Sequence, residues 1–581
     1  MSLMSSLYVG TSGLRTGQNA LNTTAHNLSN MDTAGYVRQQ VQQSSKSYLT
    51  LSIDVKSVAN KQTGLGVDYA RVKHIRDHFL DKIYRRESGR SMFYQVSTEV
   101  MEEVESQLGE MNGQAFQATL TDFWTSVQEL AKDPASSVTQ GLLVQRAEEF
   151  LQRAGAVYDG FSAYQDNLNA QIKQQVSKIN NYGKQILALN DTISAIEAGG
   201  IERANDLRDT RDQILDELAQ MANINYGEDV NGAVWVQVEG VDFVKGPRCF
   251  EIELHTDIET GFHTPFWPMN STYRTLPDGT REYLNIEGAE VFNFSREVSS
   301  ELNTDIGGLR AMLLARGDHR ADYTDMAEGK YSNVSESVLM NMQAEFDQLI
   351  HNVAIKVNEI LATAAGVTKG DLTLADGTVL KDVSYCKSDP GGYMRKDDGS
   401  PIQMFAKINS DGYRKVTGQD GSEYWVYNPE VLDGEGGKPE TETLYSVKNL
   451  RIDPELMQKP SMLGFRLADG SEDKATAEAL KNAFMEEEYT LNPNVKKKSS
   501  FIDYYDDLVG QIANSGYVFR TIYENQEGTV ESIDAAREQV IGVSSDEELS
   551  NMVKFQNAYN ASSRYINVID EMLEHLLSSL A

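Results

Sequence analysis

The sequence predicts a multidomain α+β protein with a nested layout: long helices at both ends and in an inner layer carry two β-rich outer insertions. Three observations predict this fold class. Of 12 prolines, only Pro134 lies before residue 247 and none follows Pro493, so long helices are permitted at both ends. Apolar residues repeat every seven positions in both terminal segments. The middle carries short alternating segments and Asp-Gly pairs, which are typical of antiparallel strands and their turns.

The segment from Met1 to Met31 predicts a coiled-coil-like helix with a weakened seam. One row of the seven-residue repeat is apolar, and the companion row is mostly small or polar: Leu7, Leu14, Leu21 and Leu28, beside Leu3, Gly10, Gly17, Thr24 and Met31. Arg15 is the only charged side chain in this segment, and each glycine costs about 1 kcal/mol of helix stability relative to alanine. We therefore expect a helix that is marginal alone and becomes stable when neighbouring subunits cover its neutral outer face.

The C-terminal segment, from Met552 onward, predicts a stronger amphipathic helix. Its two rows are Met552, Tyr559, Ile566, Leu573 and Leu580, and Phe555, Ser562, Ile569 and Leu576. An apolar stripe at helical spacing is usually core, and that alternative stays open for a third heptad row at 168–196. For the two terminal seams we favour an assembly interface, because an almost uncharged N-terminal helix makes a poor independent surface.

The remaining elements complete the layout. Helical patterns cover 92–108, 115–131, 141–197, 203–222, 335–364 and 501–522, and β-rich patterns cover 225–297 and 366–447. Asp-Gly pairs begin at residues 376, 398, 411 and 420. The predicted domains are a terminal helical domain (1–60 with 530–581), an inner helical domain (61–224, 334–365 and 500–529), a β-rich outer domain (225–333) and a second β-rich variable insertion (366–499).

The composition disfavours several functions. The net charge of −33 repels nucleic acids and anionic membrane surfaces, and no apolar run approaches the roughly 18 residues of a membrane helix. The N-terminus has neither the basic segment nor the apolar core of a secretory signal peptide, which taken alone indicates a cytosolic protein. Cys249 and Cys386 are interpreted as two plain thiols, with a single disulfide as the alternative.

The sequence offers little catalytic chemistry. It contains no phosphate-binding loop, nucleophile elbow or zinc-protease motif. His74, Asp77, His78 and Asp81 could bind a metal if one helix placed them on one face, but a solvated face with charge pairs is the favoured interpretation. We therefore predict no enzyme, no cofactor and no metal site.

The terminal segments resemble a known family. LYVGTSGL at 7–14 and NLSNMDTAGYVR at 27–38 are similar to the N-terminal signature of bacterial flagellar rod, hook and junction proteins. In that family an Asn-rich helix end leads into a Thr-x-Gly-Tyr turn, where glycine tolerates a positive φ. This chain departs from the pattern at Ala34, where proline is common, and at His26, where asparagine is common.

Further matches narrow the resemblance to the junction proteins. GLGV at 64–67 with IRDHFL at 75–80, and ANDLRDTRD at 204–212, resemble segments of that branch. DEEL at 546–549 and QNAYNAS at 556–562 resemble the C-terminal signature of hook and junction proteins. Hook and rod subunits are expected to be β-rich soon after residue 60, whereas helical patterns fill about 90–222 here.

The resemblance implies a structural subunit of the junction between hook and filament. It adds Asn27, Asn30, Thr33, Gly35 and Tyr36 to the seam residues as the expected assembly interface. It also implies export in an unfolded state through the type III apparatus, a dedicated chaperone on the C-terminal helix, and an extracellular place in the flagellum. The expected partners are the hook protein, the second junction protein and further copies of the chain. The alternatives are a hook or distal rod subunit, or a secreted enzyme or adhesin active in 366–447.

Overall fold

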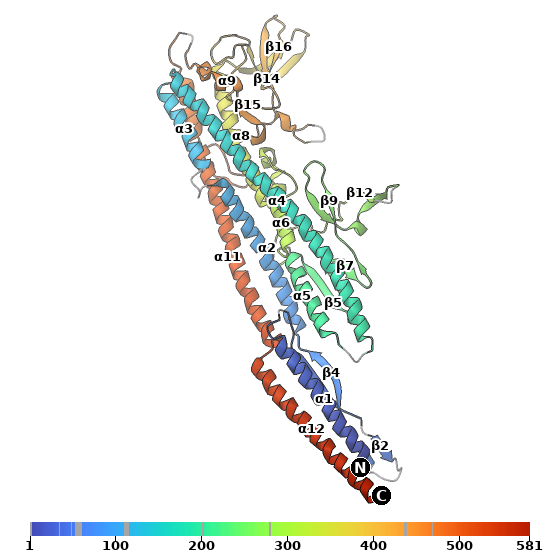
Figure 1. Ribbon diagram of the computed structural model, residues 1–581. Helices are drawn as coiled ribbons and strands as arrows, with labels where there is room; N and C mark the ends of the chain where they lie inside the picture. Colours follow the sequence, from blue (N-terminus) through green and yellow to red (C-terminus); the bar gives the residue numbers. More distant parts are fainter. Residues whose placement is uncertain are drawn as a thin grey trace.

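The computed structural model describes residues 3–33, 35–47, 49–52, 61–109, 116–199, 203–277, 281–434, 438–467 and 469–580. The chain forms an elongated molecule with both termini at one tip (Figure 1). Long helices run along its length, and β-rich parts lie at the far end and along one flank. The predicted fold class, a multidomain α+β protein with long helices, is confirmed.

The helices are α1 (Leu3–Ser29), α2 (His78–Leu108), α3 (Phe116–Lys132), α4 (Ser137–Glu197), α5 (Asn205–Met221), α6 (Gly308–Arg316), α7 (Tyr331–Val334), α8 (Val338–Ala364), α9 (Pro454–Gln458), α10 (Lys474–Met485), α11 (Phe501–Ile541) and α12 (Ser545–Leu580). None of the helices in the described ranges has the length and apolarity that a bilayer crossing requires.

The strands before the long body are β1 (Gln39–Ser45), β2 (Leu49–Ser52), β3 (Lys61–Thr63) and β4 (Val67–His74). The first outer region contains β5 (Ile224–Glu228), β6 (Val234–Val238), β7 (Val241–Lys245), β8 (Arg248–Cys249), β9 (Glu253–Thr256), β10 (His263–Phe266), β11 (Thr272–Thr275) and β12 (Arg281–Asn285). The second contains β13 (Thr368–Thr373), β14 (Val379–Lys387), β15 (Phe405–Lys407), β16 (Tyr413–Thr417), β17 (Glu423–Tyr427) and β18 (Leu450–Ile452).

The two terminal helices pack against each other along the tip of the molecule, and we call this α1–α12 pair the terminal rod. Both chain ends lie at its free end, so the helices run antiparallel (Figure 1). Strands β1 and β4 pair antiparallel beside α1, from Gln39 opposite His74 to Ser45 opposite Val67. The sequence prediction contains no strand before residue 225 and is wrong here, because 39–45 is a Gln- and Ser-rich strand without apolar alternation.

The body of the molecule is organised by α4, a helix of 61 residues and about 90 Å. The side chain of Ser136 caps it by accepting a hydrogen bond from the backbone N–H of Val138. Its heptad row is fully buried against α5, α8 and the first outer sheet: Ile172, Ile179, Ile186 and Ile193. This row is therefore core of the body, which decides the alternative left open by the sequence.

Helices α2 and α11 lie side by side and connect the body to the terminal rod. Both are longer than the sequence patterns indicate, since α2 begins at His78 and α11 runs without a break to Ile541. The domain boundary expected at 529/530 falls inside α11. Only residues 542–544 separate α11 from α12, so the change from body to rod occurs within one short link.

The β-rich regions form small antiparallel sheets. The first outer region has a four-stranded sheet of order β5-β6-β7-β8 and two hairpins, and the second has a sheet of order β13-β14-β17-β16. Three of the four predicted Asp-Gly turns place glycine in the left-handed region, with φ of +85° at Gly377, +82° at Gly399 and +74° at Gly421. The Asp-Gly pair at 411 lacks this conformation.

Candidate assembly site

The terminal rod is held by unusually small residues on α1. Gly10, Gly13, Gly17 and Ala20 repeat at spacings of three and four and face α12. A Cβ atom on Gly10 would lie 2.6 Å from Cγ1 of Ile566, and one on Gly13 would lie 2.5 Å from Oγ of Ser562. The backbone of α1 therefore contacts side chains of α12 directly, at a distance that any larger residue would prevent.

The predicted leucine row lies at the edge of this contact. Leu7, Leu14, Leu21 and Leu28 are all half-buried, whereas the buried positions of α1 are small or polar: Gly10, Ser12, Thr16, Gly17, Ala20, Thr24 and Asn27. Three members of the companion row, which the sequence predicts to be weak, are thus buried: Gly10, Gly17 and Thr24. Met31 of the same row is exposed. Glycine destabilises an isolated helix. Where two helices approach closely, however, its lack of a side chain permits the contact.

The predicted seam of α12 is divided between buried and exposed positions. Ile569 is buried, and five further positions are half-buried: Met552, Phe555, Tyr559, Ile566 and Leu573. Leu576 is 44% exposed, and the side chain of Leu580 lies outside the described residues. One face of α12 therefore contacts α1, and part of the predicted seam remains accessible.

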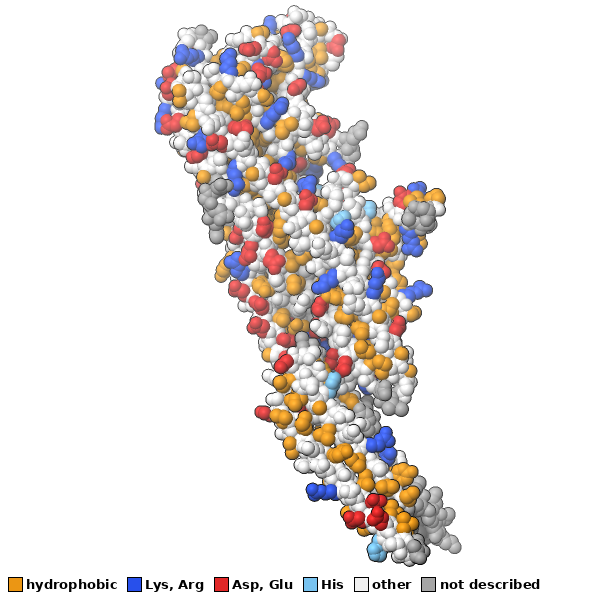
Figure 2. All heavy atoms as spheres, viewed as in Figure 1, with side chains coloured by type: hydrophobic (Ala, Val, Ile, Leu, Met, Phe, Trp, Pro, Cys, Tyr) orange, Lys and Arg blue, Asp and Glu red, His pale blue; other side chains and the backbone are white. Residues whose placement is uncertain are grey.

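A second apolar face of the terminal rod has no partner within the described part of the chain. It consists of large exposed side chains from both helices: Met4, Tyr8, Leu549, Val553, Tyr565, Val568, Met572 and Leu577. Figure 2 shows hydrophobic side chains gathered over this part of the molecule. So many exposed apolar side chains over one part of the molecule indicate an interaction site.

The signature turn after α1 has the chemistry that the resemblance implies. Gly35 adopts a φ of +77°, and Asn30 accepts a hydrogen bond of 3.2 Å from the hydroxyl of Thr33. Asn27 is buried and holds both sides of the turn. Its Oδ1 accepts from the Tyr36 hydroxyl at 2.8 Å and from the Gln39 N–H at 3.1 Å, while its Nδ2 donates to the Gln39 carbonyl at 2.8 Å.

The residues that follow the turn attach the terminal rod to the body. The backbone N–H of Val37 donates to Oδ2 of Asp209 on α5 at 3.1 Å. The guanidinium of Arg38 pairs with Glu547 at 2.8 Å and Glu548 at 2.9 Å, at the start of α12. The signature segment therefore binds α1, α5 and α12 at one point, which we call the joint.

Beside the joint lies a closed circuit of three arginines and three aspartates. Each arginine binds two aspartates: Arg76 binds Asp81 and Asp212 at 2.5 and 2.6 Å, Arg85 binds Asp212 and Asp216 at 3.1 and 2.6 Å, and Arg537 binds Asp216 and Asp81 at 2.5 and 3.0 Å. This ion-pair circuit joins the β4–α2 link, α2, α5 and α11. It is electrically neutral and largely buried, with the Arg85 side chain only 2% exposed.

Mutual pairing keeps the circuit charged in spite of burial. Burial alone raises the pKa of Asp212, but the guanidinium groups of Arg76 and Arg85 outweigh it and hold that pKa below its usual value. Burial likewise opposes the charge of Arg85, and the carboxylates of Asp216 and Asp212 nevertheless raise its pKa above the usual value. The loss of one member would leave its partners charged without compensation.

The four residues considered as possible metal ligands in the sequence have other roles in the structure. His74 ends β4 and pairs with Asp209 at 2.7 Å, Asp77 caps α2 through the N–H of Phe79, and Asp81 belongs to the circuit. Because α2 begins at His78, the four residues do not share one helical face. No cluster of metal-binding side chains occurs within the described residues.

Sequence reasoning misses the circuit because its members come from distant segments. The available signals are Asp81 with Arg85 at a spacing of four and Asp212 with Asp216 at the same spacing, which place each pair on one helical face. Such spacings also occur on solvated helices. Only the packing of α2 between α5 and α11 brings the charges together.

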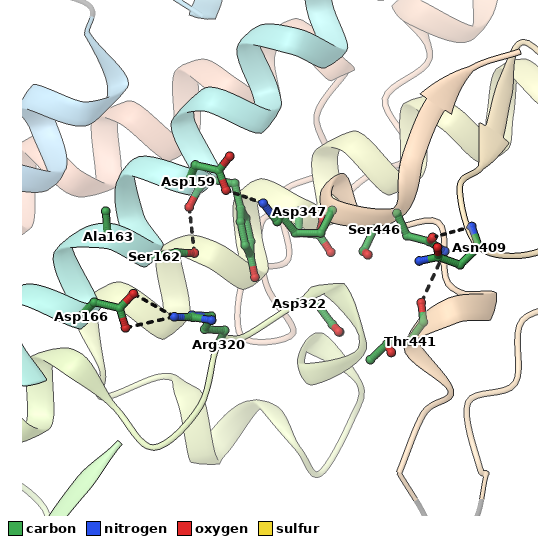
Figure 3. A pocket seen from close by; sticks show the side chains of 13 residues that line it. Asp159, Ser162, Ala163, Asp166, Arg320, Asp322, Asp347, Asn409, Thr441 and Ser446 are labelled. Atoms are coloured by element: carbon green, nitrogen blue, oxygen red, sulfur yellow. Dashed lines mark hydrogen bonds and ion pairs between the residues drawn. The ribbon is translucent and has the colours of Figure 1, made fainter. Parts of the chain in front are cut away.

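A polar cavity of about 570 Å³ lies where α4 meets the second outer region (Figure 3). Ion pairs cross it, from Asp159 to Lys448 and from Asp166 to Arg320. Asp347 is fully buried, accepts hydrogen bonds from the N–H groups of Tyr323 and Val447, and has its pKa raised by burial to about 8. The Asp159–Lys448 ion pair and the hydrogen bond from Val447 to Asp347 attach the outer region to the body.

The two cysteines are free thiols, and Cys249 is half-buried while Cys386 is buried. Burial raises the pKa of the Cys249 thiol to about 11. It also raises the pKa of the Cys386 thiol above its usual value. Burial therefore disfavours the thiolate form of both cysteines.

Three family models match the chain in order. Residues 7–36 match the flagella basal body rod protein, residues 101–373 match the flagellar hook-associated protein FlgK helical domain, and residues 540–579 match the C-terminal region of the flagellar basal body rod FlgEFG proteins. The terminal matches coincide with the terminal rod and the joint. The flagellar hook-associated protein 1 of Bacillus subtilis strain 168 is 25% identical over 565 residues, covering 97% of this chain and 96% of the relative.

The chain is therefore similar to flagellar hook-associated proteins along almost its whole length. A second relative, flagellar hook-associated protein 1 of Escherichia coli strain K12, is 23% identical and covers 98% of each chain. A solved structure, that of the flagellar hook junction protein FlgK from Burkholderia pseudomallei, is similar at a TM-score of 0.49 and 13% identity, covering 80% of this chain and 100% of that one. Together, the three family models and the relatives that match almost the full chain identify the protein as a component of the bacterial flagellum.

Substitution of Gly13 by valine is expected to separate the terminal rod, because the new side chain would overlap Ser562. We expect α1 and α12 to lose amide protection while α4 retains it, as measured by hydrogen–deuterium exchange. The matched control is Gly141→Ala in α4, where a Cβ meets nothing within 4 Å and no protection is lost. Unchanged exchange in α1 of the valine variant would contradict the close-packed seam.

Asp212→Asn is expected to destabilise the protein by about 3 kcal/mol at pH 7, because Arg76 and Arg85 lose a buried partner. Asp212 has a lowered pKa in the folded protein, so its contribution is complete above the usual value of 3.8 and is lost as the pH falls below it. The difference in urea midpoint between wild type and variant should therefore close below about pH 4. Asp166→Asn, which removes an exposed ion pair, is the control, with an expected effect below about 1 kcal/mol.

Proposed function

We propose that this protein is the structural subunit that joins the hook to the filament, as a ring of copies held by their terminal rods. The observation that carries the proposal is the apolar face of the terminal rod, which has no partner within the described part of the chain. Neighbouring copies, with the hook protein on one side and the second junction protein on the other, would cover this face. The names of the relatives, hook-associated proteins, support the same place.

The alternative of a hook or distal rod subunit is less well supported. Those families account for the terminal matches at 7–36 and 540–579, but the match at 101–373 is to a hook-associated helical domain. The long helical body built on α4 corresponds to that match. We therefore favour the junction over the hook or the rod.

We further propose that the protein leaves the cell unfolded through the type III export apparatus and acts outside the cell. The exposed apolar face of α12 fits a dedicated export chaperone, which would cover it before secretion. No catalytic residue is proposed, because the charged groups of the polar cavity between α4 and the second outer region are engaged with one another or buried. The proposed mechanism is packing alone.

Removal of residues 1–31 or 549–581 is expected to leave a folded body that cannot assemble. The body has its own core around α4 and retains the ion-pair circuit, since Arg76 and Arg537 lie outside both deletions. Circular dichroism should report cooperative unfolding, and electron microscopy should show no junction. Normal assembly by either truncated protein would refute a role for the terminal rod.

Deletion of the gene is expected to leave cells with hooks but without filaments, and with filament protein in the medium. The subunits of the filament would still be exported but would have no junction on which to polymerise. Immunoblots of the medium and electron microscopy of the cells measure both effects. Absence of hooks would indicate a rod or hook subunit instead.

A further inference from the structure

A basic pocket occurs beside the joint of this acidic chain. It is a cavity of about 560 Å³ between β4, the start of α2, α5 and the β5–β6 hairpin. Six cationic side chains line it, Lys73, Arg76, Lys82, Arg203, Arg208 and Arg211, against three acidic ones, Asp212, Glu228 and Asp229. An excess of positive charge in one cavity is unexpected in a chain of net charge −33.

Part of this positive charge has no partner. Lys73 and Lys82 are exposed at the pocket and form no ion pair with any residue in the described ranges. Arg211 is only 1% exposed, and its Nε has no hydrogen-bond acceptor among the described residues. Its nearest carboxylate, that of Glu228, lies 3.5 Å from Nη2. Nη1 of Arg211 donates to Asn190 and to the Gly232 carbonyl, so the guanidinium is held in place by neutral acceptors and adds positive charge at the base of the pocket.

A stripe of carboxylates lies on the lower half of α11. Its five members recur at spacings of three and four residues and so lie on one face of the helix: Glu524, Glu527, Glu531, Asp534 and Glu538. Four of them are exposed, and within the described part of the chain only Asp534 has a cation within 4 Å, Arg537 at 3.9 Å. The stripe is about 20 Å long, and Figure 2 shows acidic side chains along the edge of the molecule where α11 lies.

The pocket and the stripe lie at the same level of the molecule but cannot meet within one chain. Both surfaces adjoin the ion-pair circuit and therefore lie at the same height along the long axis of the molecule. Arg76 of the circuit lines the pocket, and Arg537 of the circuit follows Asp534 on α11. Helix α2 packs between α5 and α11 and separates the two surfaces (Figure 1). Two complementary surfaces on different flanks of one subunit generate a head-to-tail contact, which closes into a ring when the rotation permits.

We propose that the acidic stripe of α11 on one subunit docks at the basic pocket of the next copy. This inference rests on the proposed assembly of the protein into a ring. In that ring the contact places α11 of one copy beside the joint of the next copy. Lys73 and Lys82 at the rim meet the carboxylates first, and Arg211 lies at the base. Because both surfaces are charged, the contact steers the approach of subunits and weakens as salt screens it.

Cross-linking of the purified full-length chain tests the contact. A carbodiimide joins a lysine to a carboxylate without a spacer, so it should link Lys73 or Lys82 of one copy to the stripe of another. Equal mixing of isotopically light and heavy protein identifies such links as intermolecular by mass spectrometry. We expect their yield to fall at least about tenfold when salt is raised from low to about 0.5 M. Absence of these links at low salt and high protein concentration overturns the proposal.

Charge reversal provides the matched test in cells that lack the chromosomal gene. K73E/K82E and E527K/E531K should each reduce the number of filaments about tenfold or more, and the chain that carries all four changes should restore it. K459E, an exposed lysine far from the pocket, should have no effect. Normal filaments with either pair, or failure of the fourfold variant, overturns the proposal once immunoblots show equal export. The gene-deletion phenotype does not depend on these residues, so the proposed function is tested separately.

Discussion

The ion-pair circuit of Arg76, Arg85 and Arg537 with Asp81, Asp212 and Asp216 is the constraint on which the rest of the structure depends. Its members come from three regions that lie far apart in the sequence, 76–85, 212–216 and 537, and each is bound on both sides. Two charges buried as an isolated pair often stabilise a protein little, because desolvation offsets their attraction. A closed circuit changes the balance, since every guanidinium and every carboxylate lies beside two opposite charges and none can be removed without leaving two others with one partner fewer. The circuit thereby fixes how α2, α5 and α11 pack against one another. The joint lies directly beside it.

The sequence predicts the elements that local residue patterns determine. It does not predict the elements that depend on packing between distant segments. The buried isoleucine row of α4 and the amphipathic α12 repeat over many turns, so their periodicity suffices. The Asp-Gly turns at Gly377 and Gly421 depend on one glycine each and are equally predictable. By contrast, β1 has no apolar alternation, and its pairing with β4 is decided by position beside α1. The extension of α11 to Ile541 escapes prediction because its lower half is strongly acidic and lacks a regular apolar row.

The candidate assembly site shows the same difference between features set by local sequence and features set by packing. The signature residues Asn27, Gly35 and Tyr36 form one hydrogen-bonded turn, and their role in an assembly interface stays a prediction. The interpretation of the α1 glycines as a cost to helix formation is correct for an isolated helix and incomplete for a packed one. Once Ser562 and Ile566 lie against them, the absence of a side chain becomes the condition for contact. No property of α1 alone predicts this, because the benefit depends on which helix comes to lie beside it.

The position of both chain ends at the tip of the terminal rod has a consequence for the order of folding. Helices α1 and α12 lie at opposite ends of the sequence, so their contact closes a loop of almost the whole chain and is costly in entropy. Once the body has formed, the ion-pair circuit holds the β4–α2 link against α11, and the two helices start from neighbouring points. We therefore expect the terminal rod to be the last part of the molecule to form. Until then both ends remain single helices or unfolded segments, and other proteins can bind them.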